Sequence, residues 1–246
     1  MKYTLDNSGL TVEAAFDEAD IRDIFLPLLR HLTALRKAKG SRVLALLAAP
    51  PAAGKSTLAA LLQKLSEETP GVCPLTAIGM DGFHRRQDYL MSHTVLRDGK
   101  SVTMASVKGA PETFDLDLMR AALARVAAGE DCGWPKYDRN LHDPVDDALR
   151  VTGEVVLLEG NYLLLDAEGW RELRDFADYT VGIVADPDML RQRLVARHLA
   201  GGKSESEALR KTEQSDMVNV RLCLEHSLPA DLRLRLGRDG RYEAVE

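Results

Sequence analysis

The sequence predicts an α/β fold in which a mostly parallel sheet is covered by helices on both faces. Short apolar runs of strand length recur along the chain, at 42–48, 73–80, 154–160 and 179–185. Helical patterns separate these runs, as at 115–128 and 166–177, and strands that alternate with helices form parallel sheets. The first run, "RVLALLA", is unbroken, which is typical of a strand buried on both faces.

A helix over about 17–38 is expected before the first strand. Its apolar residues recur at helical spacing, namely Ile21, Ile24, Phe25, Leu28, Leu29, Leu32 and Leu35. Acidic residues come early in this segment and basic residues come late, as the helix dipole favours. Pro27 is a candidate for a kink, because it cannot donate a backbone hydrogen bond.

Two further helices are expected after the last apolar run, at about 186–200 and 203–227. Asp186, which is followed by proline, is a good N-cap for the first of them. Ser204 and Glu207 have the spacing of a capping box at the start of the second. The segment therefore carries its own helix start signals.

Glycines and turn residues mark the remaining boundaries. The pair at 201–202 lies between the two expected helices and is a candidate hinge. The tail 231–245 alternates around a Gly-Arg-Asp-Gly turn, which predicts a terminal hairpin. No internal repeat and no low-complexity linker is present, so we expect residues 1–246 to form a single domain.

The composition excludes several classes of protein. A chain of 246 residues, 45% of them hydrophobic, can bury one sizeable core. No apolar run approaches the length of a membrane span, and the first residues lack the layout of a signal peptide. Three cysteines without CxxC spacing argue against a disulfide framework or zinc site, and a net charge of −6 argues against nucleic acid. We expect a cytoplasmic protein without membrane or nucleic-acid partners.

Residues 49–57 read "APPAAGKST" and lie between the first strand and the next helix. A Gly-Lys-Ser/Thr sequence in that position is the end of a P-loop, whose backbone N–H groups and helix dipole surround nucleotide phosphates. The predicted ATP-binding residues are Ala53, Gly54, Lys55, Ser56 and Thr57. Lys55 would reach the terminal phosphates, and the Ser56 hydroxyl would coordinate Mg²⁺.

Two alanines stand where such a loop usually has glycine, Ala49 and Ala52. Glycine serves where φ is positive or where the backbone must approach a ligand closely. A methyl group at either position could loosen the phosphate site, whereas Gly54 is retained beside the lysine. The alternative interpretation of the segment is a strand-to-helix turn that binds nothing.

Carboxylates follow two of the buried strands. Asp81 in "GMDGFHRR" and Glu159 in "EVVLLEGNYLL" lie at carboxyl ends of predicted strands, where open α/β sheets bind ligands. Asp81 could accept the proton of an attacking hydroxyl, and Glu159 could hold Mg²⁺ directly or through water. The alternatives are an aspartate that caps a turn and a solvated glutamate at a strand end.

Arg193 and Arg197 share one face of the helix over 186–200, because they are four residues apart. Beside the glycine hinge, they could close over a triphosphate as part of a lid at about 186–215 and neutralise charge in the transition state. A solvated basic stripe is the alternative.

These pieces, in this order, resemble the P-loop kinase branch that contains uridine kinases, type I pantothenate kinases and phosphoribulokinases, over about residues 42–226. "DGFH" (81–84) is similar to the second-strand signature of that branch, which implies Asp81 as the base and His84 near the acceptor. "KGAPETFD" (108–115) resembles a stretch of the pantothenate kinases. "PKYDRNLHDPV" (135–145) is similar to a uridine kinase segment, which implies that Tyr137 and His142 contact the acceptor.

The chain looks most like bacterial proteins of the nucleoside/nucleotide kinase family, sometimes called fructose-transport-system kinases. The resemblance implies a three-layer P-loop kinase fold with a five-stranded parallel sheet and a helical lid. It also implies ATP and Mg²⁺ as cofactors, with a homodimer left open. The implied catalytic residues are Asp81, Lys55, Arg193 and Arg197, and the implied metal ligands are Ser56 and Glu159.

Three functions are compatible with these residues. The first is an ATP-dependent phosphotransferase that acts on a hydroxyl of a small metabolite, a nucleoside or a sugar being the leading candidates. The second is a regulatory protein that binds or slowly hydrolyses ATP without an acceptor, which the two loop alanines favour and Asp81 disfavours. The third, an ATPase that acts on nucleic acid, is opposed by the acidic charge.

Overall fold

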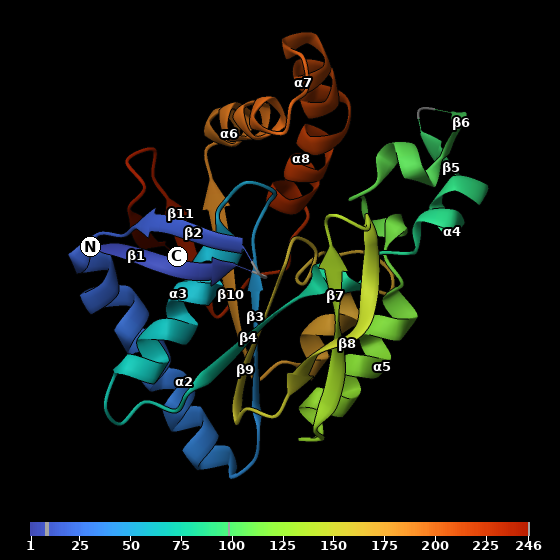
Figure 1. The fold of residues 1–246 in the computed structure, drawn as a ribbon. Helices are drawn as coiled ribbons and strands as arrows, with labels where there is room; N and C mark the ends of the chain where they lie inside the picture. The colour runs from blue at the N-terminus through green and yellow to red at the C-terminus, as the bar shows by residue number, and fades with distance from the viewer. Residues whose placement is uncertain (8–9, 98, 246) are drawn as a thin grey trace.

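The structure is a computed structural model that describes residues 1–7, 10–97 and 99–245. Its centre is a six-stranded sheet of order β12-β11-β10-β3-β9-β4 (Figure 1). The five parallel strands are β3 (Val43–Ala48), β4 (Leu75–Gly79), β9 (Val155–Gly160), β10 (Tyr179–Ala185) and β11 (Leu232–Leu236). The predicted five-stranded parallel sheet is therefore confirmed.

The sixth strand, β12 (Tyr242–Val245), pairs antiparallel with β11 and forms the terminal hairpin expected from the sequence. A hydrogen bond of 3.0 Å from Gly240 N to Gly237 O closes its turn. The hairpin is tied to the N-terminal segment as well, because the backbone N–H of Tyr242 donates to the Asp20 carboxylate at 2.9 Å.

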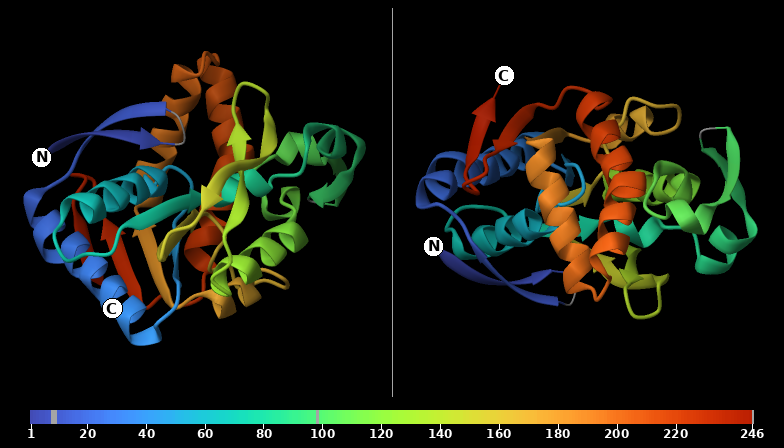
Figure 2. Two further views of the ribbon diagram at one scale, coloured as in Figure 1. Left: turned by 60° about the horizontal axis from the view of Figure 1, so that its bottom comes forward. Right: turned by 90° about the horizontal axis from the view of Figure 1, so that it is seen from above.

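The central strand explains why the sheet has helices on both faces. β3 lies between β10 and β9, and every one of its residues is buried. Leu44 and Leu46 belong to the hydrophobic cluster that includes α5 (Leu116–Ala127). Their neighbours Ala45 and Leu47 belong to the opposite cluster, with α2 (Leu26–Lys39) and α3 (Lys55–Glu68). These two helices lie on one side of the sheet and α5 lies on the other (Figures 1 and 2).

The N-terminal helix is present, although it is not a uniform α-helix. It consists of α1 (Glu18–Asp20), a π-helical turn (Ile21–Phe25) and α2. Pro27 lies at the start of α2 and has no N–H to donate, so the irregular turn falls directly before it. A hairpin that the sequence did not predict, β1 (Lys2–Asn7) with β2 (Leu10–Ala15), precedes this helix.

The helix predicted over 166–177 is shorter than expected. Only a 3₁₀ helix at Arg171–Phe176 forms, after a series of turns. Gly169 has φ of +78°, a left-handed conformation that interrupts a helix. The predicted length of the helix over 166–177 is therefore wrong.

Two small hairpins between β4 and β9 were also absent from the sequence-based prediction. They are β5 (Thr94–Arg97) with β6 (Lys100–Thr103), and β7 (Cys132–Asp138) with β8 (Asp143–Val151). Short helices accompany them, namely α4 (Gln87–Ser92) and 3₁₀ helices at Met80–Phe83, Met104–Val107 and Pro111–Thr113. These elements lie beside the end of the sheet at which β4 stops (Figure 1).

The C-terminal helices are α6 (Pro187–Ala200), α7 (Glu205–Lys211) and α8 (Met217–Glu225), with a π-helical turn at Thr212–Asp216. The predicted caps are present, because Asp186 accepts from two N–H groups of α6 and Ser204 forms the capping box of α7. α6 and α7 stand above the end of the sheet at which β10 ends (Figure 1). Among the described residues, no helix is both long and apolar enough to cross a membrane.

Candidate active site

The loop between β3 and α3 leaves a helix N-terminus open to a ligand. Gly54 is the N-cap of α3 with φ of +80°, and no side chain caps the helix there. A Cβ built on Gly54 would have no neighbouring atom within 4 Å, so the space above it is free. The first N–H groups of a helix without a side-chain cap are a favourable site for a phosphate. The predicted ATP-binding residues, Ala53 to Thr57, lie around this point.

The two loop alanines differ in backbone conformation. Ala52 has φ of +65°, which is left-handed and costs an L-residue about 1 kcal/mol. Ala49 is not among the described residues with positive φ, and it is only 2% exposed. Its N–H donates to the Gly160 carbonyl at 3.2 Å. Alanine in place of the usual glycine therefore has a conformational cost at position 52 and none at position 49.

Ser56 and Glu159 lie side by side at the carboxyl edge of the sheet. β3 and β9 are paired neighbours, which brings the first turn of α3 next to the end of β9. The Ser56 hydroxyl donates a hydrogen bond of 2.8 Å to Glu159 Oε1. A Cβ on Gly79 of the next strand would lie 3.2 Å from the same oxygen, so glycine leaves room for the carboxylate.

The charge of Glu159 depends on its neighbours. Burial raises the pKa of its carboxyl, and the charge of Lys55 and the hydrogen bond from Ser56 act in the opposite direction. A hydroxyl and a carboxylate are oxygen ligands of the kind that Mg²⁺ prefers. The described residues contain no cluster of three or more His, Cys, Asp or Glu that could hold a metal.

Asp81 follows β4 within the 3₁₀ helix Met80–Phe83, and it is exposed at the same edge of the sheet. Its position is fixed by the β7–β8 hairpin. Trp134 Nε1 donates to the Gly79 carbonyl at 2.9 Å. A Cβ on Gly82 would lie 2.1 Å from the Pro135 carbonyl oxygen, so only glycine permits this approach of the two backbones.

His84 and Tyr137 lie together next to Asp81. Their rings are 5.2 Å apart, and His84 Nδ1 lies 2.8 Å from the Asp81 backbone carbonyl. Because a carbonyl can only accept, Nδ1 carries the proton, which leaves Nε2 as an acceptor in the neutral ring. Burial lowers the pKa of His84, which favours that neutral form. The structure thus brings together three of the four predicted acceptor residues.

His142 lies in the turn of the β7–β8 hairpin, and its imidazole is exposed. Its backbone has φ of +56°, and its carbonyl, instead of its ring, accepts a hydrogen bond from Lys108 at 2.9 Å. The ring of His142 therefore stays a predicted acceptor contact.

Lys108 is a member of this cluster that sequence reasoning missed. Its Nζ lies 4.9 Å from the centroid of the Tyr137 ring and donates to Gln87 Oε1 at 2.9 Å. Burial lowers the pKa of its ammonium group. Lys108 opens the segment "KGAPETFD", which resembles a stretch of the pantothenate kinases, but that pattern by itself assigns Lys108 no role.

The two lid arginines are placed differently. Arg193 of α6 is half-buried and donates from Nη1 to the Ala52 carbonyl at 3.4 Å, so it contacts the P-loop itself. Arg197 lies one turn further along α6 and is exposed. α6 is joined to the following helices by a hydrogen bond of 2.6 Å between His198 and Asp216.

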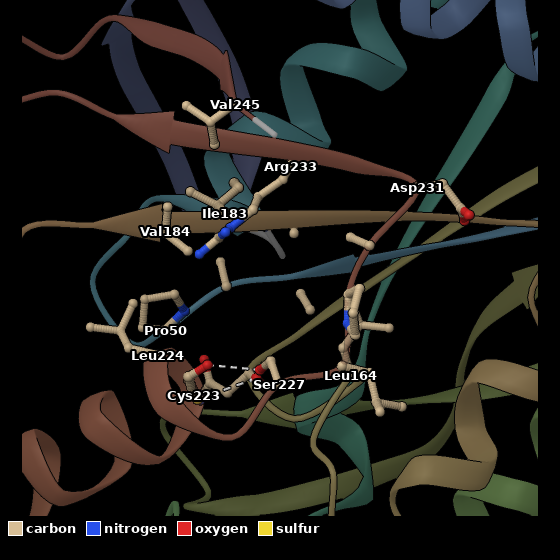
Figure 3. A pocket seen from close by; sticks show the side chains of 17 residues that line it. Pro50, Leu164, Ile183, Val184, Cys223, Leu224, Ser227, Asp231, Arg233 and Val245 are labelled. Atoms are coloured by element: carbon tan, nitrogen blue, oxygen red, sulfur yellow. Dashed lines mark hydrogen bonds between the residues drawn. The ribbon is translucent and has the colours of Figure 1, made fainter.

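A cavity of about 360 Å³ lies between the start of the P-loop, β10, the end of α8 and the start of β11. Figure 3 shows Pro50, Leu224 and Cys223 on one wall, facing Val184 and Arg233. Burial raises the pKa of the Cys223 thiol to about 12, which disfavours the thiolate form. None of the predicted acceptor residues lines this cavity.

A phosphate-binding loop after the central strand, with Ser56, Glu159 and Asp81 at one sheet edge, defines a P-loop kinase fold and site. The sequence profile of the phosphoribulokinase / uridine kinase family matches residues 44–220, so the chain belongs to this family of ATP-dependent small-molecule kinases. The resemblance inferred from the motifs is thereby confirmed.

Individual relatives agree with this assignment. The "Uncharacterized protein YggC" of Escherichia coli (strain K12) is 39% identical over 243 residues, 98% of each chain. The "Putative uridine kinase C227.14" of Schizosaccharomyces pombe is 32% identical over 200 residues, 79% of this chain and 83% of its own. The crystal structure of a "putative fructose transport system kinase" from Silicibacter sp. TM1040 superposes with a TM-score of 0.70 at 31% identity, covering 82% of this chain and 98% of that one.

Proposed function

We propose that this kinase transfers the γ-phosphoryl group of ATP to a hydroxyl of a small metabolite, with Asp81 as the base. A nucleoside and a sugar are the leading acceptor candidates. The observation that carries the proposal is the placement of Asp81 at the end of β4, next to the strand that holds Glu159. An acceptor hydroxyl at Asp81 would thus face the phosphates held above α3.

The nucleotide side is assembled from the loop and the lid. The N–H groups of Gly54 to Thr57 bind the phosphates beside Ala53, whose own N–H donates to the Pro50 carbonyl at 3.3 Å, and Lys55 compensates the phosphate charge. Arg193 already contacts the loop through the Ala52 carbonyl, and Arg197 shares its helix face. Both guanidinium groups would stabilise the negative charge that develops on the transferring group.

Mg²⁺ fits the oxygen pair of Ser56 and Glu159, which would hold it directly or through water. When bound beside ATP, the ion would neutralise phosphate charge and orient the γ-phosphoryl group. The Ser56 hydroxyl now donates to Glu159, and the same hydroxyl oxygen has lone pairs available to a metal. The closeness of these two oxygens supports a shared metal site.

The acceptor side activates the hydroxyl. Asp81 takes the hydroxyl proton as the acceptor oxygen bonds to the γ-phosphorus and the bond to the ADP oxygen breaks. His84 Nε2 can accept a hydrogen bond from a second hydroxyl, and Tyr137 forms a wall of the site. Most of the rate enhancement would come from positioning and electrostatics.

The setting of the enzyme is part of the same proposal. We expect a cytoplasmic protein whose partner is a small-molecule acceptor, without nucleic acid or membrane, and with a homodimer left open. The acidic net charge of −6 supports the absence of nucleic acid.

The test is incubation with ATP and Mg²⁺ against pooled nucleosides, sugars and pantothenate, with mass spectrometry of the products. The Asp81→Asn protein runs in parallel. A phosphorylated acceptor that disappears with Asp81→Asn, while ATP binding persists, supports the proposal. Unchanged turnover by that variant rules out Asp81 as the base.

The second candidate is a regulatory protein that binds or slowly hydrolyses ATP without an acceptor. The left-handed conformation of Ala52 favours it, because a loop under conformational cost is less well adapted to hold phosphates. ATP binding without a product from any pool would favour this candidate.

A further inference from the structure

Hydrogen bonds fix both the backbone beside Lys108 and the ammonium group of its side chain. The carbonyl of the next residue, Gly109, accepts from the Tyr162 hydroxyl at 2.6 Å and from Asn219 Nδ2 at 3.3 Å. The side chain then reaches across to Gln87 Oε1 and to the His142 carbonyl, each at 2.9 Å. The ammonium group therefore occupies one defined position beside the acceptor cluster.

The partners of this ammonium group are all neutral. They are an amide oxygen, a backbone carbonyl and the face of the Tyr137 ring. Across the described parts of the chain, Lys108 forms no ion pair. The charge of Asp143 raises the pKa of Lys108 without an ion pair between the two side chains. Asp143 Oδ1 instead accepts a hydrogen bond from the Gln87 N–H at 2.6 Å. A partly desolvated cation is normally matched by an anion, and here the protein supplies none in contact.

A chain of contacts connects Lys108 through Tyr137 and His84 to Asp81. Tyr137 contacts Lys108 on its ring face and lies 5.2 Å from the ring of His84, and His84 bonds to the Asp81 carbonyl. The charge of Lys108 also acts on His84. A small molecule with its hydroxyl at Asp81 would therefore extend along Tyr137 toward the ammonium group.

We infer that Lys108 binds an anionic group of the acceptor, so that the substrate is a hydroxylated acid bearing a carboxylate or a phosphate, not a neutral nucleoside or sugar. The inference rests on the proposed function and narrows its acceptor class. The acceptor side of the edge carries the carboxylate of Asp81, and the whole chain has a net charge of −6. An anionic acceptor consequently requires a local cation, and Lys108 supplies one.

Matched pairs of compounds test the inference. The wild-type protein is incubated with ATP and Mg²⁺ and with ribose or ribose 5-phosphate, glucose or gluconate, panthenol or pantothenate, and uridine. We expect phosphorylation of an acidic member and much less of its neutral partner. The phosphate and carboxylate pairs distinguish the two kinds of anion. A neutral compound phosphorylated as well as its acidic partner overturns the inference and leaves the proposed function intact. No product from any compound overturns both.

Substitutions separate an anion-binding lysine from a structural one. Lys108→Met should raise the KM of the acidic acceptor roughly tenfold to a hundredfold, the value of a charge-assisted hydrogen bond, and should leave the KM of ATP unchanged. Lys108→Arg should restore part of the affinity because it keeps the charge. Lys37→Met, an exposed lysine on α2, is the matched control.

A structural role gives a different result. If Lys108 only connects the β7–β8 turn to α4, Lys108→Met lowers the melting temperature and raises the KM of acidic and neutral acceptors alike. That outcome contradicts the inference. An unchanged melting temperature together with a KM effect confined to the acid supports it.

Discussion

The Ser56 hydroxyl donates a 2.8 Å hydrogen bond to Glu159 Oε1, which joins the first turn of α3 to the end of β9. The two residues are separated by 103 positions in the sequence, and the pairing of β3 with β9 brings them together. A P-loop hydroxyl and a strand-end carboxylate therefore form a single oxygen pair. If this pair holds Mg²⁺, the metal requirement of the enzyme depends on both side chains.

Glu159→Gln should lower kcat by about 100-fold and raise the Mg²⁺ concentration needed for half-maximal activity, because a neutral amide is a poorer ligand for a hard cation. Ser56→Ala should act in the same direction. The measurement is kcat as a function of Mg²⁺ concentration. Glu68→Gln, a change at the exposed end of α3, is the control. An unaltered Mg²⁺ dependence in Glu159→Gln would remove Glu159 from the metal site.

Ala52→Gly should change the stability of the protein by less than about 1 kcal/mol and leave ATP affinity unchanged or improved, because the relief of left-handed strain is offset by the greater freedom of glycine in the unfolded chain. Ala49→Gly should destabilise it by about 1 kcal/mol, because a buried methyl group is lost and the unfolded chain gains freedom. Urea unfolding and ATP titration of both variants measure these changes. A large loss of ATP affinity in Ala52→Gly would show that the loop is built around the alanine.

Gly82→Ala should destabilise the protein by roughly 1–3 kcal/mol and reduce activity, since its Cβ would lie 2.1 Å from the Pro135 carbonyl oxygen. The 3₁₀ helix that carries Asp81 would have to move away from the β7–β8 hairpin. Thermal unfolding and kcat are measured together. Gly201→Ala is the control for unfolding alone, because its Cβ would meet its nearest atoms at 3.4 Å. Equal effects of the two substitutions would contradict this explanation.

Arg193→Ala should lower kcat by about 100-fold, the effect of removing one donor that stabilises transition-state charge. Arg197→Ala should act in the same direction if α6 closes over ATP, since the two side chains share a helix face. Steady-state kinetics with ATP varied give both values, and Arg22→Ala on the exposed N-terminal segment is the control. A normal kcat in both variants would favour a solvated basic stripe over a lid.

His84 should make stability depend on pH below neutrality. Burial lowers its pKa from the ordinary value of 6.5, so the unfolded chain binds a proton before the folded protein does. The contribution of His84 is therefore complete above pH 6.5 and is lost as the pH falls through the lower pKa of the folded state. Urea unfolding between neutral and mildly acidic pH should show this loss, and His84→Gln should reduce it. The same slope in both proteins would assign the loss to other groups.

The local elements of this protein could be predicted because their signals are local. The unbroken apolar run before the P-loop, the caps at Asp186 and Ser204, and the carboxylates after two strands are contiguous patterns whose physical cause lies within a few residues. The parallel order of the strands followed from their alternation with helices. These signals led to the P-loop, to Asp81 and to Glu159.

Tertiary structure alone decided how these residues meet. Lys108 reaches Gln87, 21 positions away, and the His142 carbonyl, 34 positions away, and no short pattern encodes such contacts. The sequence does not distinguish Ala49 from Ala52, yet of these two residues only Ala52 has a positive φ, because of the path of the loop. A motif specifies which chemical groups are present, whereas their contacts, burial and backbone strain arise from packing between segments that are distant in the chain.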